Sequence, residues 1–247
     1  MNRTANQIPI LLKAIQVLEE LGSEPETATS AALAKRLGVS GASCYRILQT
    51  FLARGWVRTL PGGGYALGAG LLPIARSVTG RDPLATWYPI LTQFASSRGW
   101  TCKLSIRRAN TAVTVYRVEG SRPYALAVRT GTAFPIAYGS SGAALLADAT
   151  AAEVEALIAT APAECWRHQT PDHLRQRISE VAATGAVIDS GGFRPDIVSC
   201  SVPLRDATGR VEAAATALGF AADTGPGELA EVAAALVAAL ATQVGTR

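Results

Sequence analysis

The sequence predicts an α+β protein in two parts: a helical N-terminal part that ends in a short β-hairpin, and a larger C-terminal part built on an antiparallel sheet. Three observations lead to this prediction. Apolar residues recur at three- and four-residue spacings over residues 8–53, which is the period of a helix with one buried face. Over residues 101–118 and 197–218 they approach a period of two, which is typical of strands. The net charge of +4 lies entirely in residues 1–80, which contain eight Lys or Arg and four Asp or Glu.

The composition is that of a folded protein of one or two domains. The chain has 247 residues, of which 49% are hydrophobic and 17% charged, so a large core can form and disorder of the whole chain is excluded. Its four cysteines are scattered without a CxxC pair, and the N-terminus lacks the pattern of a secretory signal. The longest apolar run, residues 232–241, is about half of the roughly 20 residues that span a bilayer. We expect a reduced, soluble, cytoplasmic protein without membrane contact.

Residues 8–21 are expected to form the first helix. Six apolar side chains at helical spacing predict that this helix buries one face, and Gly22 is placed to end it. The six are Ile8, Leu11, Leu12, Ile15, Leu18 and Leu21. A polar loop with Pro25 follows.

Two further helices are predicted next, joined by a tight turn. Thr29 or Ser30 is a good N-cap for a helix that ends at Gly38, and Ser40 is a good N-cap for a helix over residues 41–53. The inner face of this last helix is predicted to consist of Cys44, Ile47, Leu48, Phe51 and Leu52. Small and polar side chains form its outer face, which allows a close approach to another molecule.

A hairpin completes this part of the chain. Residues 56–60 and 65–67 are expected to pair as two strands, with a glycine-rich tip at residues 61–64. Helix, helix, turn, helix and hairpin together make the winged helix-turn-helix arrangement. Residues 27–80 contain no Asp or Glu, which suits a surface that contacts the phosphates of double-stranded DNA. The expected DNA-binding residues are Lys35, Arg36, Ser40, Gly41, Ser43, Tyr45, Arg46, Arg54, Arg58 and Gly63.

The outer face of residues 41–53 provides the expected contacts to bases and phosphates. Ser43 and Tyr45 can hydrogen-bond to phosphates or base edges, while Arg46 can reach a phosphate or a guanine. The helix begins with Gly41 and has few base-reading side chains, so we expect a second copy of the chain to be needed to select a site. A winged helix that binds only proteins is the alternative, and a salt titration against DNA distinguishes the two.

The chain is expected to divide near Arg81. The expected parts are a DNA-binding domain of residues 1–68, linker and dimerisation helices over residues 69–99, and an effector-binding domain of residues 100–247. Pro73 is expected to start or kink the first linker helix, and the pair Asp82-Pro83 to open the second. Large apolar side chains over residues 71–94 suit packing or a contact between two copies.

The C-terminal part is expected to be an antiparallel sheet with helices packed around it. The predicted strands are residues 101–107, 111–118, 124–129, 186–189, 197–204 and 211–218, and the predicted helices are residues 141–147, 151–159, 171–183 and 228–244. The first two strands form a hairpin that turns at Ala109-Asn110.

Several blocks of the sequence carry a family resemblance. They are KAIQVLEEL, LAKRLGVSGASCYRILQTFLARGWV, GGYALG, YRVEG, PIAYGSSGAALLA and IDSGGFRPDIVSCSVPLRDATGRVEAAATALGF. Over nearly its whole length the chain resembles the IclR family of bacterial transcriptional regulators. The resemblance implies a winged helix-turn-helix domain, a linker helix and a GAF-like effector-binding domain, with no cofactor. It also implies dimers or tetramers on palindromic operators, repression or activation as the outcome, and a small carboxylate or aromatic compound as the effector. Repression relieved by the ligand is the expected default.

The resemblance also places an effector pocket over the sheet, between the loop before a short helix and the late strands. It assigns six positions: Ser140, Ser141, Asp189, Ser199, Thr216 and Leu218. Ser140 and Ser141 fall at the start of the short helix, where the helix dipole favours an anion. Three positions depart from the family pattern, because Ser199 replaces a common cysteine, Leu218 a common serine and Ala137 a common histidine. These departures predict a less polar pocket, suited to a small aromatic or hydrophobic carboxylate or its amide-like relative.

Two other kinds of site are weighed against this one. Residues 139–142 superficially resemble a serine-nucleophile turn, but they are not G-x-S-x-G, and a triad would need His168 or His173. Cys165 and the two histidines have C-x₂-H-x₄-H spacing, which is a weak metal-binding pattern on a polar loop. We expect no catalytic serine, no metal site and no enzymatic activity.

Overall fold

The computed structural model describes residues 8–23, 28–79, 82–122, 126 and 128–241. The contacts between residues divide the chain into two compact units, Met1–Pro83 and Leu84–Arg247, close to the division expected at Arg81. Each unit has a hydrophobic core of its own.

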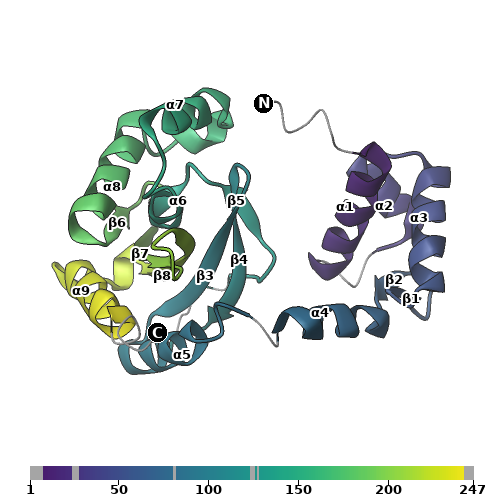
Figure 1. The fold of residues 1–247 in the computed structure, drawn as a ribbon, viewed down its shortest axis with the longest axis horizontal. Helices are drawn as coiled ribbons and strands as arrows, with labels where there is room; N and C mark the ends of the chain where they lie inside the picture. The colour runs from purple at the N-terminus through teal and green to yellow at the C-terminus, as the bar shows by residue number, and fades with distance from the viewer. Residues whose placement is uncertain (1–7, 24–27, 80–81, 123–125, 127, 242–247) are drawn as a thin grey trace. The chain divides into compact units, whose positions relative to one another are not determined.

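The first unit is a three-helix bundle followed by a hairpin and a fourth helix (Figure 1). Its elements are α1 (Pro9–Ser23), α2 (Ser30–Leu37), α3 (Gly41–Ala53), β1 (Val57–Thr59), β2 (Tyr65–Leu67) and α4 (Leu72–Thr79). The two strands pair antiparallel, with Val57 opposite Leu67. Cys44, Ile47, Leu48 and Phe51 of α3 are buried as predicted, whereas Leu52 is only partly buried. The predicted winged helix-turn-helix fold is confirmed.

The prediction of a single buried face on α1 is wrong for four of its six apolar residues. The exposed ones are Ile8, Leu11, Leu12 and Ile15. The buried side chains of this helix are Val17 and Leu21, which belong to the core that α1 shares with α2 and α3. Because the neighbouring elements cover only the second half of α1, the apolar residues of its first half stay at the surface of the single chain.

The second unit is organised around a six-stranded antiparallel sheet with the order β5-β4-β3-β8-β7-β6. Its strands are β3 (Thr101–Arg108), β4 (Thr111–Val118), β5 (Ala133–Pro135), β6 (Val187–Ser190), β7 (Ile197–Arg205) and β8 (Val211–Phe220). Its helices are α5 (Trp87–Arg98), α6 (Gly139–Leu145), α7 (Ala151–Thr160), α8 (Pro171–Thr184) and α9 (Glu228–Ala241). The predicted α+β class is confirmed.

The two faces of this sheet are covered by different helices. Helices α5 and α9 lie over one face, and α6, α7 and α8 lie on the other side (Figure 1). Successive side chains of a strand point to opposite faces. On β3, Cys102 and Leu104 therefore join the core beneath α5 and α9, while Lys103 and Ser105 face the side of α6.

The segment expected as a linker, residues 69–99, is split between the units. Helix α4 belongs to the first unit and α5 to the second. Trp87, Leu91 and Phe94 are buried in the core that α5 forms with β3 and α9, because the sheet offers these large side chains an apolar surface. Among the described residues, no helix is both long enough and apolar enough to cross a membrane.

The strand predicted at residues 124–129 differs from the structure. Residues 124, 125 and 127 lie outside the described residues, while Leu126, Val128 and Arg129 are not in a strand. The edge of the sheet is formed instead by β5, in which Phe134 lies opposite Ala112 of β4. This short strand escaped the sequence analysis because three residues are too few to display a period.

Candidate DNA-binding surface and ligand pocket

Local hydrogen bonds fix the turn between α2 and α3. Thr29 Oγ1 accepts a hydrogen bond from the backbone N–H of Ala32 (3.2 Å), and Ser40 Oγ accepts one from the N–H of Ser43 (3.2 Å). These are the N-caps predicted from the sequence. Gly38 ends α2 with φ of 59°, a left-handed conformation that glycine adopts without strain. The start of α3 is therefore set by residues of the turn itself.

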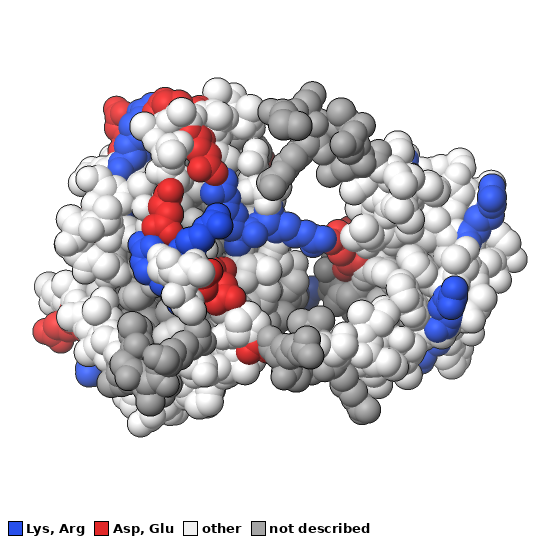
Figure 2. All heavy atoms as spheres, viewed as in Figure 1, with Lys and Arg blue, Asp and Glu red and all other residues white. Residues whose placement is uncertain are grey.

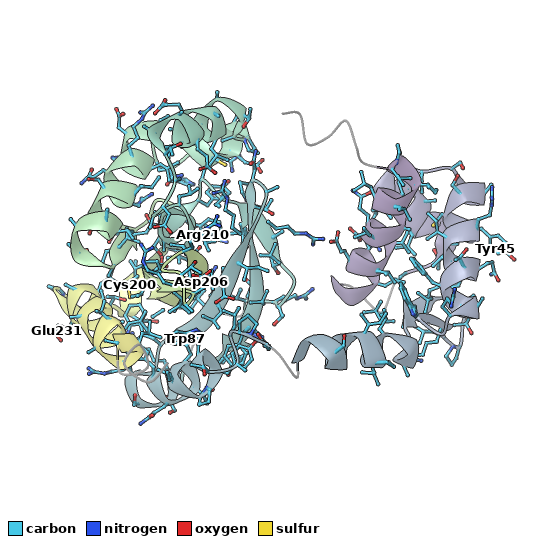
Figure 3. All side chains as sticks on the ribbon, in the orientation of Figure 1. Tyr45, Trp87, Cys200, Asp206, Arg210 and Glu231 are labelled. Carbon is cyan, nitrogen blue, oxygen red and sulfur yellow. The ribbon has the colours of Figure 1, made fainter. Side chains whose placement is uncertain are left out.

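The outer face of α3 is left open by this packing. Tyr45 is 54% exposed and points away from the first unit, and Arg46 beside it is also exposed (Figure 3). The hydroxyl groups of Ser40 and Ser43 are hydrogen-bonded to each other (2.9 Å) at the start of the helix. The side chains at Tyr45 and Arg46 are thus the ones best placed to reach another molecule.

The remaining predicted DNA-binding residues lie around this helix. Exposed among them are Lys35, Arg36, Gly41, Arg54, Arg58 and Gly63. Arg36 forms an ion pair with Glu20 of α1 (3.2 Å), so its charge is partly neutralised within the unit. On the rim of the first unit at the right of Figure 2, Lys and Arg atoms occur without acidic atoms among them. This surface has the charge that contact with DNA phosphates requires.

The hairpin tip needs glycine because of its backbone conformation, and not because a larger side chain would lack space there. Gly62 and Gly63 have φ of 96° and 86°, and a Cβ built on either would meet nothing within 4 Å. The backbone N–H of Leu60 donates to the carbonyl of Gly64 (2.7 Å) and closes the tip. The result is a turn whose backbone is exposed at residues 61–63.

The second unit contains a cavity of about 440 Å³ on the α6 side of the sheet. Of the six assigned effector positions, those that line it are Ser140, Ser141, Ser199, Thr216 and Leu218. The register of the sheet brings the late strands together, because Ser199 of β7 lies opposite Leu218 of β8. On its other side β8 pairs with β3, which places Thr216 opposite Lys103.

Four hydroxyl groups form a continuous chain at one end of the cavity. Ser199 and Ser140 are 2.7 Å apart, and Ser201 and Thr216 are 2.8 Å apart, measured between hydroxyl oxygens. Ser201 donates to Ser140 (2.8 Å), which joins the two pairs. Ser201 was missed in the sequence analysis, although it follows Ser199 by two residues and so faces the same side of β7.

The structure places Asp189 away from the cavity lining. Its side chain is 2% exposed and forms an ion pair with Arg177 of α8. It also accepts hydrogen bonds from the backbone N–H groups of Gly192 and Phe193, both at 3.2 Å. Asp189 therefore holds the loop between β6 and β7 in place, rather than contacting the space where a ligand would lie.

Aromatic rings form a further part of the cavity lining. Phe193 stands edge-on to Phe134 (centroids 5.4 Å apart, planes at 78°) and to Tyr138 (5.2 Å, 85°). Edge-to-face packing of this kind is favourable beyond the area that it buries. Leu126, Ile197 and Leu218 extend the apolar part of the lining.

Lys103 is a charged residue of the lining that the sequence analysis missed. Its side chain is 9% exposed, and its Nζ lies 5.7 Å from the centroid of the Phe134 ring. Burial lowers the pKa of Lys103 to about 8. A signal was present in the sequence, since the alternation over residues 101–106 puts Lys103 on the face opposite Cys102 and Leu104.

The other kinds of site receive no geometric support within the described residues. Ser140 Oγ hydrogen-bonds to Ser199 and Ser201 there, and no histidine contacts it. His173 caps α8, accepting from the N–H of Thr170 through Nδ1 (3.2 Å). The described residues contain no group of three or more His, Cys, Asp or Glu that could hold a metal ion. Burial also raises the pKa of the Cys165 thiol, which disfavours the thiolate that binds metals.

Two family models match the chain. "Bacterial transcriptional regulator IclR C-terminal" matches residues 75–245, and "IclR helix-turn-helix domain" matches residues 11–61. A curated relative is a probable transcriptional regulator, SauR, of Cupriavidus necator. It is 26% identical over 176 residues, which cover 70% of this chain and 69% of that protein.

Solved structures share the fold. An IclR transcriptional regulator from Alicyclobacillus acidocaldarius superposes with a TM-score of 0.83 at 24% identity, covering 96% of this chain and 97% of that one. An IclR homologue from Microbacterium hydrocarbonoxydans, complexed with 4-hydroxybenzoate, gives 0.80 at 18% identity, covering 96% and 100%. Members of such a family are transcriptional regulators, which are normally not enzymes. With both of its parts matched, one by a model that spans more than half of its length, the chain belongs to the IclR family of bacterial transcriptional regulators.

Proposed function

We propose that this regulator is a repressor that binds a palindromic operator as a dimer or tetramer and senses a small aromatic carboxylate in the cytoplasm. The observation that carries the proposal is the cavity of about 440 Å³, which is lined both by aromatic rings and by hydroxyl groups of a hydrogen-bonded chain. The same chain carries an exposed helix of the kind that enters the major groove.

The shape and lining of the cavity favour an aromatic acid. Its volume lies within the range of roughly 300–1,000 Å³ that is usual for small-molecule sites. The rings of Phe134 and Phe193 offer faces and edges to an aromatic ring, while the hydroxyl groups of Ser140 and Ser199 offer hydrogen bonds to an oxyanion. The homologue from Microbacterium hydrocarbonoxydans was solved with 4-hydroxybenzoate, which supports the same class of effector here.

Asp189 has an indirect part in this proposal. By binding the N–H groups of Gly192 and Phe193, it positions the loop that carries the Phe193 ring over the cavity. We therefore assign Asp189 to support of the pocket, and direct contact with the effector to the five lining positions.

The exposed apolar residues of the first unit support assembly of two copies. Leu11 is 55% exposed and Ile15 44% exposed on α1, and Leu72 and Ile74 are exposed on α4. Isolated chains rarely leave neighbouring large apolar side chains in water, and such groups commonly mark contacts between proteins. Two copies are also what reading a palindrome requires, because each α3 reaches one half-site.

Charged residues on α1 are expected to separate the copies. The double variant Leu11→Lys/Ile15→Lys should weaken self-association by about 30-fold or more, since charges at the centre of an apolar interface typically cost 2 kcal/mol or more. Sedimentation velocity over a range of concentrations measures this. Gln16→Lys, at an exposed polar position of the same helix, is the control and should sediment as the wild type does. A double variant that keeps the wild-type distribution would place the interface elsewhere.

A selection from random DNA tests the function as a whole. Duplexes retained by the purified protein are sequenced, and the best one is titrated in a gel shift at fixed salt with and without 4-hydroxybenzoate. We expect a palindromic site whose binding weakens when the acid is added. Tighter binding in its presence would favour the alternative in which the effector-bound protein acts on the operator, as an activator or with a corepressor. Failure to enrich any sequence would refute operator binding.

The DNA-reading assignment of α3 is tested at Arg46. Arg46→Ala should weaken binding to the selected duplex by about 10-fold or more, because it removes a contact to a phosphate or to a guanine. Arg210→Ala removes an equal charge from an exposed position of the second unit and is the matched control. Equal affinities of the two variants would show that Arg46 does not contact DNA.

A further inference from the structure

Lys103 occupies an unusual electrostatic position in the cavity. It lies on β3, opposite Thr216 of β8, with 9% of its surface exposed. None of the described residues that line the cavity is Asp or Glu. Asp189, the buried carboxylate on β6, is already paired with Arg177 and with two backbone N–H groups. A cation withdrawn from water without a negative partner is unfavourable, so buried charges are normally paired.

The contact that Lys103 does make is a weak substitute for an anion. Among the described residues, the ammonium group interacts only with the Phe134 ring, whose centroid is 5.7 Å from Nζ. That distance is near the limit of about 6 Å for attraction between a cation and a ring. The ammonium group therefore retains donors for a partner that the described residues do not supply.

In the chain of hydroxyl groups, one O–H is not used within the chain itself. Ser201 uses its proton to bond Ser140, so Thr216 must be the donor to Ser201. The remaining contact, between Ser140 and Ser199, consumes one of their two protons. One O–H of Ser140 or Ser199 is left to donate into the cavity, which both residues line. The same cavity thus offers a positive charge and a free hydroxyl donor.

We propose that Lys103 is the anion anchor of the pocket and makes it selective for ionised acids over their neutral isosteres. The oxyanion of a small aromatic acid binds the Lys103 ammonium and the spare hydroxyl group, while its ring lies against Phe134 and Phe193. This assignment rests on the proposed function, in which the cavity holds the effector. It adds the charge of the effector and the residue that recognises it.

Binding of the acid is then coupled to the protonation of Lys103. Burial lowers the pKa of Lys103 to about 8, so most of the empty protein carries the charge at pH 7 and little of it does at pH 9. Among the described residues, the other charged groups of the lining are Arg129 and Arg194, and Tyr138 is the remaining titratable group. Affinity for an acid should fall about 10-fold from pH 7 to pH 9, the factor by which the protonated fraction of Lys103 decreases.

Calorimetric titration with benzoate and benzamide tests the anchor. Benzoate stays ionised throughout this pH range, and benzamide is its neutral isostere. At pH 7, Lys103→Met should weaken benzoate binding by about 30-fold, within the range for losing a hydrogen bond to a charged group, and should leave benzamide binding unchanged. Lys103→Arg should keep measurable benzoate binding but lose its dependence on pH, because arginine does not titrate there. Arg210→Met, at an exposed position of the second unit outside the lining, is the control for loss of positive charge and should bind benzoate as the wild type does.

These experiments distinguish failure of the proposed role of Lys103 from failure of the proposed function, the sensing of an aromatic acid in the cavity. If benzoate binds Lys103→Met and wild type alike, or if benzamide binds as tightly as benzoate, the anchor is refuted while the aromatic effector pocket remains. If benzoate, 4-hydroxybenzoate and phenylacetate all fail to bind the wild type at millimolar concentration, the anchor and the proposed aromatic acid are both refuted. The pKa of Lys103, followed by NMR of ¹³C-labelled lysine, should rise when benzoate is added, and a pKa that does not respond would also refute the anchor.

Discussion

Asp189→Ala is expected to be the most destabilising single substitution among the polar residues of the second unit. It should lower the free energy of unfolding by about 3–5 kcal/mol, the usual cost of removing one partner of a buried ion pair. Arg177, of which the side chain is 12% exposed, would be left without its carboxylate, and the N–H groups of Gly192 and Phe193 without their acceptor. Urea denaturation followed by circular dichroism measures the change.

A matched control exists in the neighbouring loop. Asp196 is also paired with an arginine, Arg194 (2.9 Å), but both side chains are more than half exposed. Asp196→Ala should therefore change the free energy of unfolding by no more than about 1 kcal/mol. Adding Arg177→Met to Asp189→Ala should restore part of the stability, because it removes the unpaired buried charge. If the two aspartate variants unfold at the same urea concentration, the buried pair does not have the structural role assigned to it.

Lys103→Met is expected to stabilise the ligand-free protein at pH 7 and to lose that advantage in alkaline solution. Burial lowers the pKa of Lys103 to about 8, whereas a lysine in the unfolded chain keeps a pKa of about 10.4. Between these values the unfolded state binds more protons than the folded state, so the free energy of unfolding of the wild type rises with pH. The methionine variant lacks this rise.

The difference between the two proteins is therefore the quantity to measure. At pH 7 the variant should be more stable by on the order of 3 kcal/mol, at 1.36 kcal/mol per pKa unit, and most of this should vanish by about pH 10.5. Other groups that titrate in this range are the same in both proteins and cancel in the difference. Lys35→Met, at an exposed position of α2, is the control and should follow the wild type at every pH. If the free energies of unfolding of Lys103→Met and wild type change with pH in parallel, the pKa of Lys103 is not lowered in the folded protein.

Features that depend on a few neighbouring residues could be predicted from the sequence. The caps at Thr29 and Ser40 and the turn at Gly38 are local, since each hydrogen bond joins residues that are at most four positions apart. Alternation located the strands that carry Ser199 and Thr216, and the family resemblance pointed to their shared pocket. These positions line one cavity in the structure.

Features that depend on distant partners could not be predicted in this way. The period of α1 indicates that Leu11 and Ile15 are apolar together, but it cannot say whether another element of the same chain covers them. Asp189 could be recognised as a polar position near the pocket, yet its pairing with Arg177 joins a strand to a helix earlier in the chain. The burial of Lys103 could not be predicted for the same reason. A lysine on a strand is ordinarily expected to face water unless helices are known to cover that face of the sheet.

The alternation along β3, β7 and β8 bears on how sensors of this kind diversify. One face of these strands carries the folding core beneath α5 and α9, and the other carries the floor of the cavity. A substitution at Lys103 or Leu218 would alter the lining of the cavity while leaving Cys102 and Ala217, which point the other way, untouched. After a gene duplication, a handful of such changes would give a receptor for a new compound, with the inherited scaffold and its assembly left intact.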